Sequence, residues 1–570
     1  MNVKSLAIKN VKSFGEEIPI NFQDGLNIFI GPNAGGKSNL MDILNITLVY
    51  FFLHPWRVRP EYDETGTTLR RKYLEERHTE IFNPINQFLE KHIKRGEGPQ
   101  QIKITFCPER EDAENIKNII KHKEELINFE AKEYSNSRRL KDEFLVHLAE
   151  FDVGSLIGSE LEFIIENDNP IQISNLEQKH KVFLSYLRFF RLFSILVEEY
   201  NQSVKEESGK IPNLYPPVIY FSPYRISQMR NLTATLSASD FSTLLEKYEK
   251  SDSKTISSTF EVANYYFAKK LRYLNDDITK FKSEEEIKFI KRYIEKLGYK
   301  DFGYECKNKE KNIYEGLLTK NDGTILDLSK ASGGEKEILN LLLGIFAFNV
   351  KNGVIIIDEP ELHLHPRWQQ VLLELFSDFT ESRGIQFFIV THSPHFVIPQ
   401  SIRSIFRVYS ENGESQVVPP QNLNENDKEL FMLVNIFNNT KVFFADKVIL
   451  VEGDVDLIIY ESILEMVQID MKNSEIIEII KVQQEGGIQK NKDFLEKWQI
   501  KTYGVVDKDK SIQSQGIFIL KNGEIEDYFQ NIIKKTKYDI YDAIKIAKKI
   551  RAKEIEIPKE LKDIFPKIIS

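Results

Sequence analysis

Cysteine is nearly absent from this chain, which contains only two cysteines among its 570 residues. Cys107 and Cys306 lie far apart and neither belongs to a CxxC pair, so a disulfide scaffold and a cysteine-based zinc site are excluded. Low cysteine content fits a reducing cytosol, and a cytoplasmic protein is expected. The first residues also lack the apolar stretch that is typical of a signal peptide.

Long hydrophobic runs are missing as well, apart from residues 40–56. This run contains Asp42 and Asn45 and ends in a His-Pro pair, so we expect a buried helix there and not a membrane span. The sequence therefore predicts no membrane partner.

A positive net charge is the third absence, since the chain carries a formal charge of −9. Proteins that coat nucleic acid without sequence preference are usually basic. Any contact with nucleic acid must therefore use a local basic surface, or metal ions that neutralise acidic residues at the phosphate. The composition, with 41% hydrophobic and 29% charged residues, is typical of globular domains with sizeable cores.

The sequence predicts strands toward both ends of the chain and charge-rich helices in the middle. Helical spacing covers residues 111–151, 177–204 and most of 241–297. Short apolar runs predict strands at residues 3–11, 26–30, 101–106, 161–165, 216–222, 353–357, 385–390, 448–451 and 502–506. Continuous apolar strands are typical of parallel sheets that are buried on both faces, so an α/β fold is expected.

A glycine-rich loop follows the second of these strands. Residues 31–38 read GPNAGGKS, which matches the Walker A phosphate loop in full and precedes a helical stretch. The backbone N–H groups can approach phosphates, Lys37 can contact the β and γ oxygens, and the Ser38 hydroxyl can ligate Mg²⁺. The predicted nucleotide-binding residues of this loop are Asn33, Gly35, Gly36, Lys37, Ser38 and Asn39.

Three further motifs follow in the order that a nucleotide hydrolase requires. The apolar strand 354–357 runs into Asp358 and Glu359, a Walker B pattern in which Asp358 would hold Mg²⁺ and Glu359 would polarise the attacking water. His392 lies in THSP at the end of another strand, where it could reach a γ-phosphate. Between Walker A and Walker B stands SGGEK, which resembles the signature motif of ATP-binding-cassette ATPases through Ser332, Gly333 and Gly334.

The resemblance to cassette ATPases implies a dimer. In that family the signature serine and glycines act on the nucleotide bound by the other protomer, and this chain has one copy of each motif. A homodimer or higher homo-oligomer with ATP at the interface is therefore implied. The interval from Lys37 to Ser332 exceeds a minimal head, which leaves room for a helical insertion that extends the interface or binds a partner protein. Gln228 is interpreted as an ordinary loop residue.

Carboxylates follow two strands near the end of the chain. Glu452 ends the strand at 448–451, Asp456 follows at a helix start, and Asp507 ends the strand at 502–506. The C-terminal edge of a parallel sheet is where α/β sites lie, and oxygen ligands at this density suit Mg²⁺ or Mn²⁺. This order is how the Toprim fold gathers carboxylates, and it predicts metal ligation by Glu452, Asp456, Asp507, Asp509 and Glu526.

Toprim sheets also serve topoisomerases and primases. The chain looks too short to add a domain with a tyrosine nucleophile, and two distant cysteines cannot form a primase zinc module. A hydrolytic nuclease remains, in which one or two metal ions activate water and stabilise the leaving oxygen. The catalytic residues would be Glu359 and His392 in the ATPase and Glu452, Asp507 and Asp509 in the nuclease.

A cassette ATPase followed by Toprim resembles the overcoming lysogenization defect (OLD) family of ATP-dependent nucleases, and also the Gabija nuclease subunit and the PARIS ATPase and Toprim system. The resemblance implies ATP and Mg²⁺ or Mn²⁺ as cofactors, DNA or RNA as the target, and a role in anti-phage defence. It also implies a transition-state lysine, for which Lys548 and Lys549 match the pattern poorly.

The predicted fold is α/β, with an ATPase head, an inserted helical dimerisation region and a C-terminal Toprim domain. The predicted segments are residues 1–110 and 301–425 for the head, 111–300 for the mostly helical insertion with some head strands, and 445–570 for Toprim. Two other functions stay open: an ATP-driven sensor or scaffold with a degenerate Toprim unit, and a DNA-repair cassette ATPase with a helical clamp.

Overall fold

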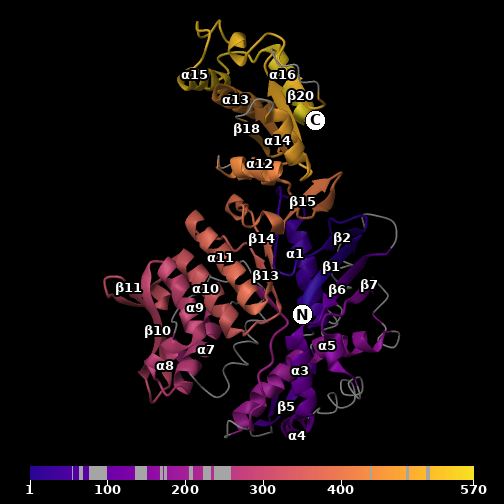
Figure 1. Cartoon of the computed structure of the whole chain (residues 1–570), viewed down its shortest axis with the longest axis vertical. Coiled ribbons are helices and arrows are strands. Elements are labelled where there is room, and N and C mark those ends of the chain that lie inside the picture. The colour runs from indigo at the N-terminus through magenta and orange to yellow at the C-terminus, as the bar shows by residue number, and fades with distance from the viewer. Residues whose placement is uncertain are drawn as a thin grey trace. The chain divides into compact units, whose positions relative to one another are not determined.

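The computed structural model describes residues 1–53, 56–62, 68–75, 99–134, 151–166, 171, 176–204, 209–221, 233–235, 259–436, 439–482, 487–508 and 514–569. These residues form two compact units (Figure 1). The first unit contains residues 1–29, 38–391 and 413–415, and the second contains residues 30–37, 392–412 and 416–570. Each unit is described by itself below.

Strands of the first unit belong to four sheets. An antiparallel sheet has the order β2-β1-β6-β7, and a second antiparallel sheet joins β10, β11 and β12, with β9 paired to β11. A third sheet includes the parallel strands β3-β14-β13-β8, and β4 pairs with β5. The bounds are β1 Asn2–Lys9, β2 Ile18–Asn21, β3 Leu26–Ile30, β4 Trp56–Tyr62, β5 Thr68–Glu75, β6 Gln101–Cys107, β7 Leu161–Glu166, β8 Val218–Phe221, β9 Thr233–Thr235, β10 Tyr299–Asn308, β11 Ile313–Lys320, β12 Ile325–Asp327, β13 Val354–Asp358 and β14 Gln386–Val390.

The parallel strands form the core of the first unit because their side chains are apolar on both faces. Residues 354–357 of β13 and all of β14 are buried. Phe388 of β14 stacks against Phe29 of β3 at 6.4 Å between ring centroids, and Phe22 contacts it edge-on at 4.8 Å. Such burial supplies the main favourable term in folding.

Helices cover these sheets. The long helix α5 confirms the helix expected at residues 177–204, and α10 buries nearly its whole length. The run at 40–56 lies in α1 and a π-helical segment, Ile46–Phe52, before β4 begins. The bounds are α1 Lys37–Asn45, α3 Arg110–Lys121, α4 Lys123–Glu133, α5 Gln178–Ser203, α7 Thr259–Tyr273, α8 Ile278–Ser283, α9 Glu285–Lys296, α10 Gly333–Ala347 and α11 Pro366–Arg383.

One buried carboxyl in α4 makes the stability of the first unit depend on pH. Glu130 is fully buried, and neither carboxyl oxygen has a hydrogen-bond partner within the described residues. Burial raises the pKa of Glu130 to about 8. The folded chain therefore holds a proton that the unfolded chain has lost above its ordinary pKa near 4.5, so stability falls as pH rises from that value through 8.

Replacing Glu130 with glutamine should remove this pH dependence, because the amide keeps the shape and cannot ionise. We expect a higher melting temperature than that of the wild type at pH 8.5 and little difference at pH 5.5, measured by calorimetry. Glu124→Gln, at an exposed position on the same helix, is the control and should not change the profile. Equal effects of Glu130→Gln at both pH values would contradict the assignment.

The second unit is built on a four-stranded parallel sheet of order β18-β17-β19-β20. Helices α13, α15 and α16 share one core with this sheet, centred on buried apolar residues such as Ile449, Ile463 and Phe565. The bounds are β15 Ile405–Glu411, β16 Glu414–Val418, α12 Glu425–Ile436, the 3-10 helix η10 Asn439–Phe444, β17 Lys447–Val451, α13 Asp454–Met471, β18 Ile477–Lys481, α14 Gly487–Glu496, β19 Lys501–Val506, β20 Ile517–Ile519, the 3-10 helix η11 Ile525–Tyr528, α15 Ile540–Arg551 and α16 Lys559–Ile569.

The predicted strands are confirmed within one or two residues at each end. The α/β class is also confirmed. The four predicted segment boundaries stay a prediction, and the units divide the chain differently, since residues 30–37 and 392–412 group with the C-terminal part. No helix within the described ranges is both long and apolar enough to cross a bilayer.

Candidate functional sites

The phosphate loop lies in the second unit as a tight turn after β3. Gly31 and Gly36 adopt φ angles of 139° and 108°, which side-chain-bearing residues rarely adopt. The Lys37 amine is buried and donates hydrogen bonds to the carbonyls of Gly31 at 2.9 Å and Pro32 at 2.8 Å. Its charge is therefore held inside the loop, beside the backbone that would face phosphates. Asn33 is exposed at the tip.

Ser38 and Asn39, which continue this motif in α1, belong to the first unit. Ser38 is exposed, and Asn39 donates a hydrogen bond to the Ser13 hydroxyl at 2.7 Å. A hydrogen bond of the same length joins the Ser415 and Ser13 hydroxyls. The asparagine is thus fixed by neighbours of the first unit, which sequence reasoning did not foresee.

Three strands of the first unit end side by side. Phe29 of β3 is in register with Val390 of β14, which is in register with Asp358 of β13. The Walker B carboxylate therefore lies at the carboxyl edge of the sheet, where ligands of α/β proteins bind. Glu359 follows in the left-handed region with a φ of 48°, and its N–H donates to the Val390 carbonyl at 2.9 Å. A non-glycine residue in this region is often found at functional sites.

The signature residues form the start of α10. Ser332 is its N-cap, and Gly333 and Gly334 are the first helical residues. The Ser332 hydroxyl accepts a hydrogen bond from the Glu335 N–H at 3.4 Å, and the Glu335 carboxylate accepts one from the Ser332 N–H at 2.7 Å. This capping box satisfies the N–H groups of Ser332 and Glu335 and defines where the helix begins.

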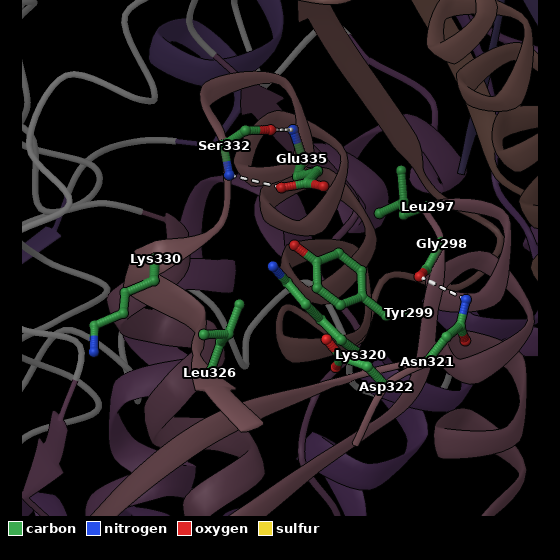
Figure 2. A pocket seen from close by; sticks show the side chains of 10 residues that line it. All are labelled: Leu297, Gly298, Tyr299, Lys320, Asn321, Asp322, Leu326, Lys330, Ser332 and Glu335. Atoms are coloured by element: carbon green, nitrogen blue, oxygen red, sulfur yellow. Dashed lines mark hydrogen bonds between the residues drawn. The ribbon is translucent and has the colours of Figure 1, made fainter. Parts of the chain in front are cut away.

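A pocket of about 550 Å³ opens beside the signature. Figure 2 shows Lys330, Tyr299 and Lys320 around it together with Ser332 and Glu335. Burial, followed by the Glu335 carboxylate, raises the pKa of Tyr299 to about 12, so its hydroxyl keeps its proton at neutral pH. The strands β10 and β11 that form one wall of the pocket had not been predicted.

In the second unit, β17 and β19 are adjacent and parallel, so both end at the same sheet edge. Glu452 follows β17, and Asp507 follows β19. Asp456 is at the third position of α13, where its carboxylate accepts a hydrogen bond from the Gly453 N–H at 2.8 Å. Glu526 lies in η11, after β20. All four carboxylates are half-buried.

Asp456 senses both its burial and the neighbouring carboxylates. Its pKa is raised to about 6, mainly by burial and also by the negative charges of Glu526 and Glu452, against the hydrogen bond from Gly453. The pKa of the buried Tyr460 hydroxyl is also raised, by burial and then by Asp456 and other acids including Asp507. Tyr460, one turn after Asp456, was missed because a tyrosine in an apolar helix resembles an ordinary core residue.

A divalent cation fits the chemistry of these side chains. They offer only oxygen donors, which suit Mg²⁺ or Mn²⁺, and a cation would offset the negative charges of Glu526 and Glu452, which add to the effect of burial on the pKa of Asp456. Among the residues that the structure describes, no three potential ligands lie close enough to hold one metal ion as they stand. Asp509, the fifth predicted ligand, lies outside the described residues, as does Gln228.

Two other predicted groups are placed on exposed surface. Lys548 and Lys549 are exposed in the last turn of α15, so the choice of a transition-state lysine stays a prediction. His392 is exposed and directly follows the first unit, as the first residue of its segment in the second unit.

Two protein-family models match different parts of the chain. The AAA ATPase domain family matches residues 1–397. The chain belongs to the AAA ATPase domain family. The C-terminal part of this ATPase matches the overcoming lysogenization defect protein-like TOPRIM domain at residues 443–509. The two matches confirm the predicted order of an ATPase followed by Toprim.

Individual relatives of the ATPase match over shorter segments. The OLD nuclease of Thermus scotoductus is 27% identical over 26% of this chain and 30% of its own length. The Old nuclease of Escherichia phage P2 is 24% identical over 32% of this chain and 34% of its own length. The chain thus spans about a third or less of these curated relatives. A solved SMC head domain from Thermotoga maritima covers 74% of this chain and 100% of its own, at 14% identity and a TM-score of 0.30.

Proposed function

We propose that this protein is an ATP-hydrolysing, metal-dependent endonuclease in which the ATPase controls phosphodiester hydrolysis at the Toprim site. The carrying observation is that Glu452 and Asp507 follow the adjacent parallel strands β17 and β19, so both carboxylates lie at one sheet edge. The Toprim family match and the names of the two OLD nucleases support the same reaction.

At the Toprim site, Glu452, Asp456, Asp507 and Glu526 would hold Mg²⁺ or Mn²⁺, with Asp509 as a further ligand. The metal supplies an activated water and stabilises the leaving oxygen of the phosphodiester. The carboxylates fix where that charge sits, and the half-buried edge limits how many waters surround it. Glu452 and Asp507 end the two central strands, so both are held by the rigid part of the sheet.

At the nucleotide site, the phosphate loop residues Gly35, Gly36 and Lys37 would bind the phosphates, with Ser38 and Asp358 on Mg²⁺. Glu359 would orient water, and His392 would contact the γ-phosphate. Ser332, Gly333 and Gly334 would act on the nucleotide of a second protomer, which makes a homodimer part of the proposal. Ser332 is the N-cap of α10 and the two glycines are its first residues, so all three lie together at one helix end.

The test uses the purified protein with supercoiled plasmid, linear DNA and tRNA, with Mg²⁺ or Mn²⁺, each with and without ATP. We expect cleavage that requires the metal and that falls by at least about 100-fold in Asp507→Ala, the range typical of a lost catalytic group. The preferred substrate distinguishes a DNA target, which we favour, from RNA. Cleavage that persists in Asp507→Ala would contradict the proposal.

A sensor that controls a partner effector is the second candidate function. A retron Ec83 probable ATPase of Escherichia coli is 36% identical over 15% of this chain and 18% of its own length, and the ATPase in its name is the activity on which a sensor would depend. An anti-phage role fits both candidates. The sensor predicts nucleic-acid or protein binding without metal and no cleavage of any of the three substrates.

A further inference from the structure

A buried arginine of β15, Arg407, bonds to residues that precede the Toprim strands β17 and β19. Arg407 has 1% of its surface exposed. Its guanidinium donates to four main-chain carbonyls: Phe443 at 3.3 Å, Ala445 at 2.8 Å, Trp498 at 3.2 Å and Gln499 at 3.0 Å. Burial lowers the pKa of Arg407 to about 10, so the side chain stays charged at neutral pH and keeps its five donors.

The four carbonyls lie where the two central Toprim strands begin. Ala445 precedes β17 by two residues, and Trp498 and Gln499 precede β19 by three and two residues. The rings of Phe443 and Trp498 are in edge-to-face contact at 5.3 Å, and both are fully buried. Arg407 therefore fixes the starting ends of the strands whose other ends carry the carboxylates Glu452 and Asp507.

The next residue of β15 contacts the phosphate loop. A Cβ atom at Gly31 would overlap the carbonyl oxygen of Val408, and one at Gly35 would lie 2.6 Å from it. Only glycine allows this approach, so the loop backbone and β15 are in direct contact. The loop, β15 and the Toprim strands all belong to the second unit.

A second attachment follows the THSP motif. The Thr440 hydroxyl of η10 donates to the carbonyl of Pro394 at 3.3 Å. Pro394 is the last residue of the motif that contains His392. The short helix η10 is thus attached to two segments. One is the THSP motif, through Thr440, and the other is β15, through the Phe443 carbonyl that accepts from Arg407. β15 in turn contacts the phosphate loop.

We propose that Arg407 is a positioning residue that transmits nucleotide-dependent shifts of the phosphate loop to the Toprim carboxylates. A shift of the loop moves Val408, and the guanidinium carries the movement to the starting ends of β17 and β19. Because both strands are rigid and end at Glu452 and Asp507, the separation of the metal ligands changes with the nucleotide. This inference rests on the proposed function, since it connects the two sites of that function.

The decisive variant is Arg407→Lys, which keeps the charge but offers a single nitrogen that cannot reach four carbonyls. We measure the cleavage rate with and without ATP, and ATP hydrolysis. The ratio of the two cleavage rates should move toward one by about tenfold, a typical coupling, while ATP hydrolysis and ATP-free cleavage stay within about twofold of wild type. The exposed Arg403, four residues earlier, gives the matched control Arg403→Lys, which should keep the wild-type ratio.

An unchanged ratio in Arg407→Lys overturns the proposal. A parallel loss of both activities with a lower melting temperature also overturns it, because that result shows a purely structural role. If the wild-type protein cleaves equally fast with and without ATP, ATP does not control cleavage, and this result also overturns the proposal.

Hydrogen exchange tests the same route without cleavage. Adding a non-hydrolysable ATP analogue with Mg²⁺ to the wild-type protein should change amide protection in residues 445–451 and 500–506, and the change should be absent in Arg407→Lys. No change in the wild type, or an equal change in both proteins, overturns the proposal. If the variant does not fold, the wild-type measurement still tests the proposal, because an unchanged wild type overturns it. A protein that shows the exchange response but cleaves nothing would reject the proposed nuclease and leave the coupling in place.

Discussion

Replacing Glu452 with alanine should lower cleavage by at least about 100-fold while ATP hydrolysis stays within about twofold of wild type, because metal-dependent hydrolysis loses one of its ligands. Glu452 directly follows β17, the central strand that pairs with both β18 and β19. The measurement is plasmid or tRNA cleavage at several Mg²⁺ and Mn²⁺ concentrations, beside steady-state ATP turnover.

The matched control for Glu452→Ala is Asp454→Ala. Asp454 begins α13 two residues later, is exposed and forms an ion pair with Lys481 at 2.7 Å. It shares the local negative charge but lies outside the group that raises the pKa of Asp456. Cleavage should therefore survive in Asp454→Ala. Equal losses in both variants would attribute the effect to net charge, and intact cleavage in Glu452→Ala would reject the metal site.

The strands and the nucleotide motifs could be predicted because their signals are local. Val354 to Ile357 is apolar without interruption, which in a chain of this composition indicates a strand buried on both faces. The acids that follow such strands are expected at one sheet edge, and Glu452 and Asp507 do follow the adjacent parallel strands β17 and β19. Their role as metal ligands stays a prediction. A glycine-rich segment between a strand and a helix predicts a phosphate-binding turn by itself.

Features that depend on distant pairing could not be predicted. In the sequence, Arg407 resembles any charged residue of a strand. Only its burial and its hydrogen bonds to the carbonyls of Phe443 and Trp498 show that it connects β15 to the residues before β17 and β19. The strands β10 and β11 mix polar and apolar residues without a clear alternation, so no local pattern distinguishes them from a loop. Tyr460 shows the same limit, because its relation to Asp456 depends on electrostatics in the folded state.

Replacing Glu359 with glutamine should lower ATP turnover by about 100- to 10,000-fold, the range of a lost general base, while ATP still binds. Glutamine keeps the size of the side chain and removes the charge that polarises water. Glu359 has a left-handed backbone conformation, and its N–H donates to the Val390 carbonyl at the sheet edge. Turnover is measured by phosphate release, and binding by titration with a fluorescent ATP analogue.

Glu381→Gln serves as the control for Glu359→Gln, because Glu381 is exposed in the last turn of α11 and no motif includes it. Its turnover should equal that of the wild type. Turnover within about threefold of wild type in Glu359→Gln would reject Glu359 as the base, given the usual size of such effects. Where the variant binds ATP and does not hydrolyse it, its cleavage rate shows directly whether the ATP-bound state activates or restrains the Toprim site, since the nucleotide remains bound throughout the assay.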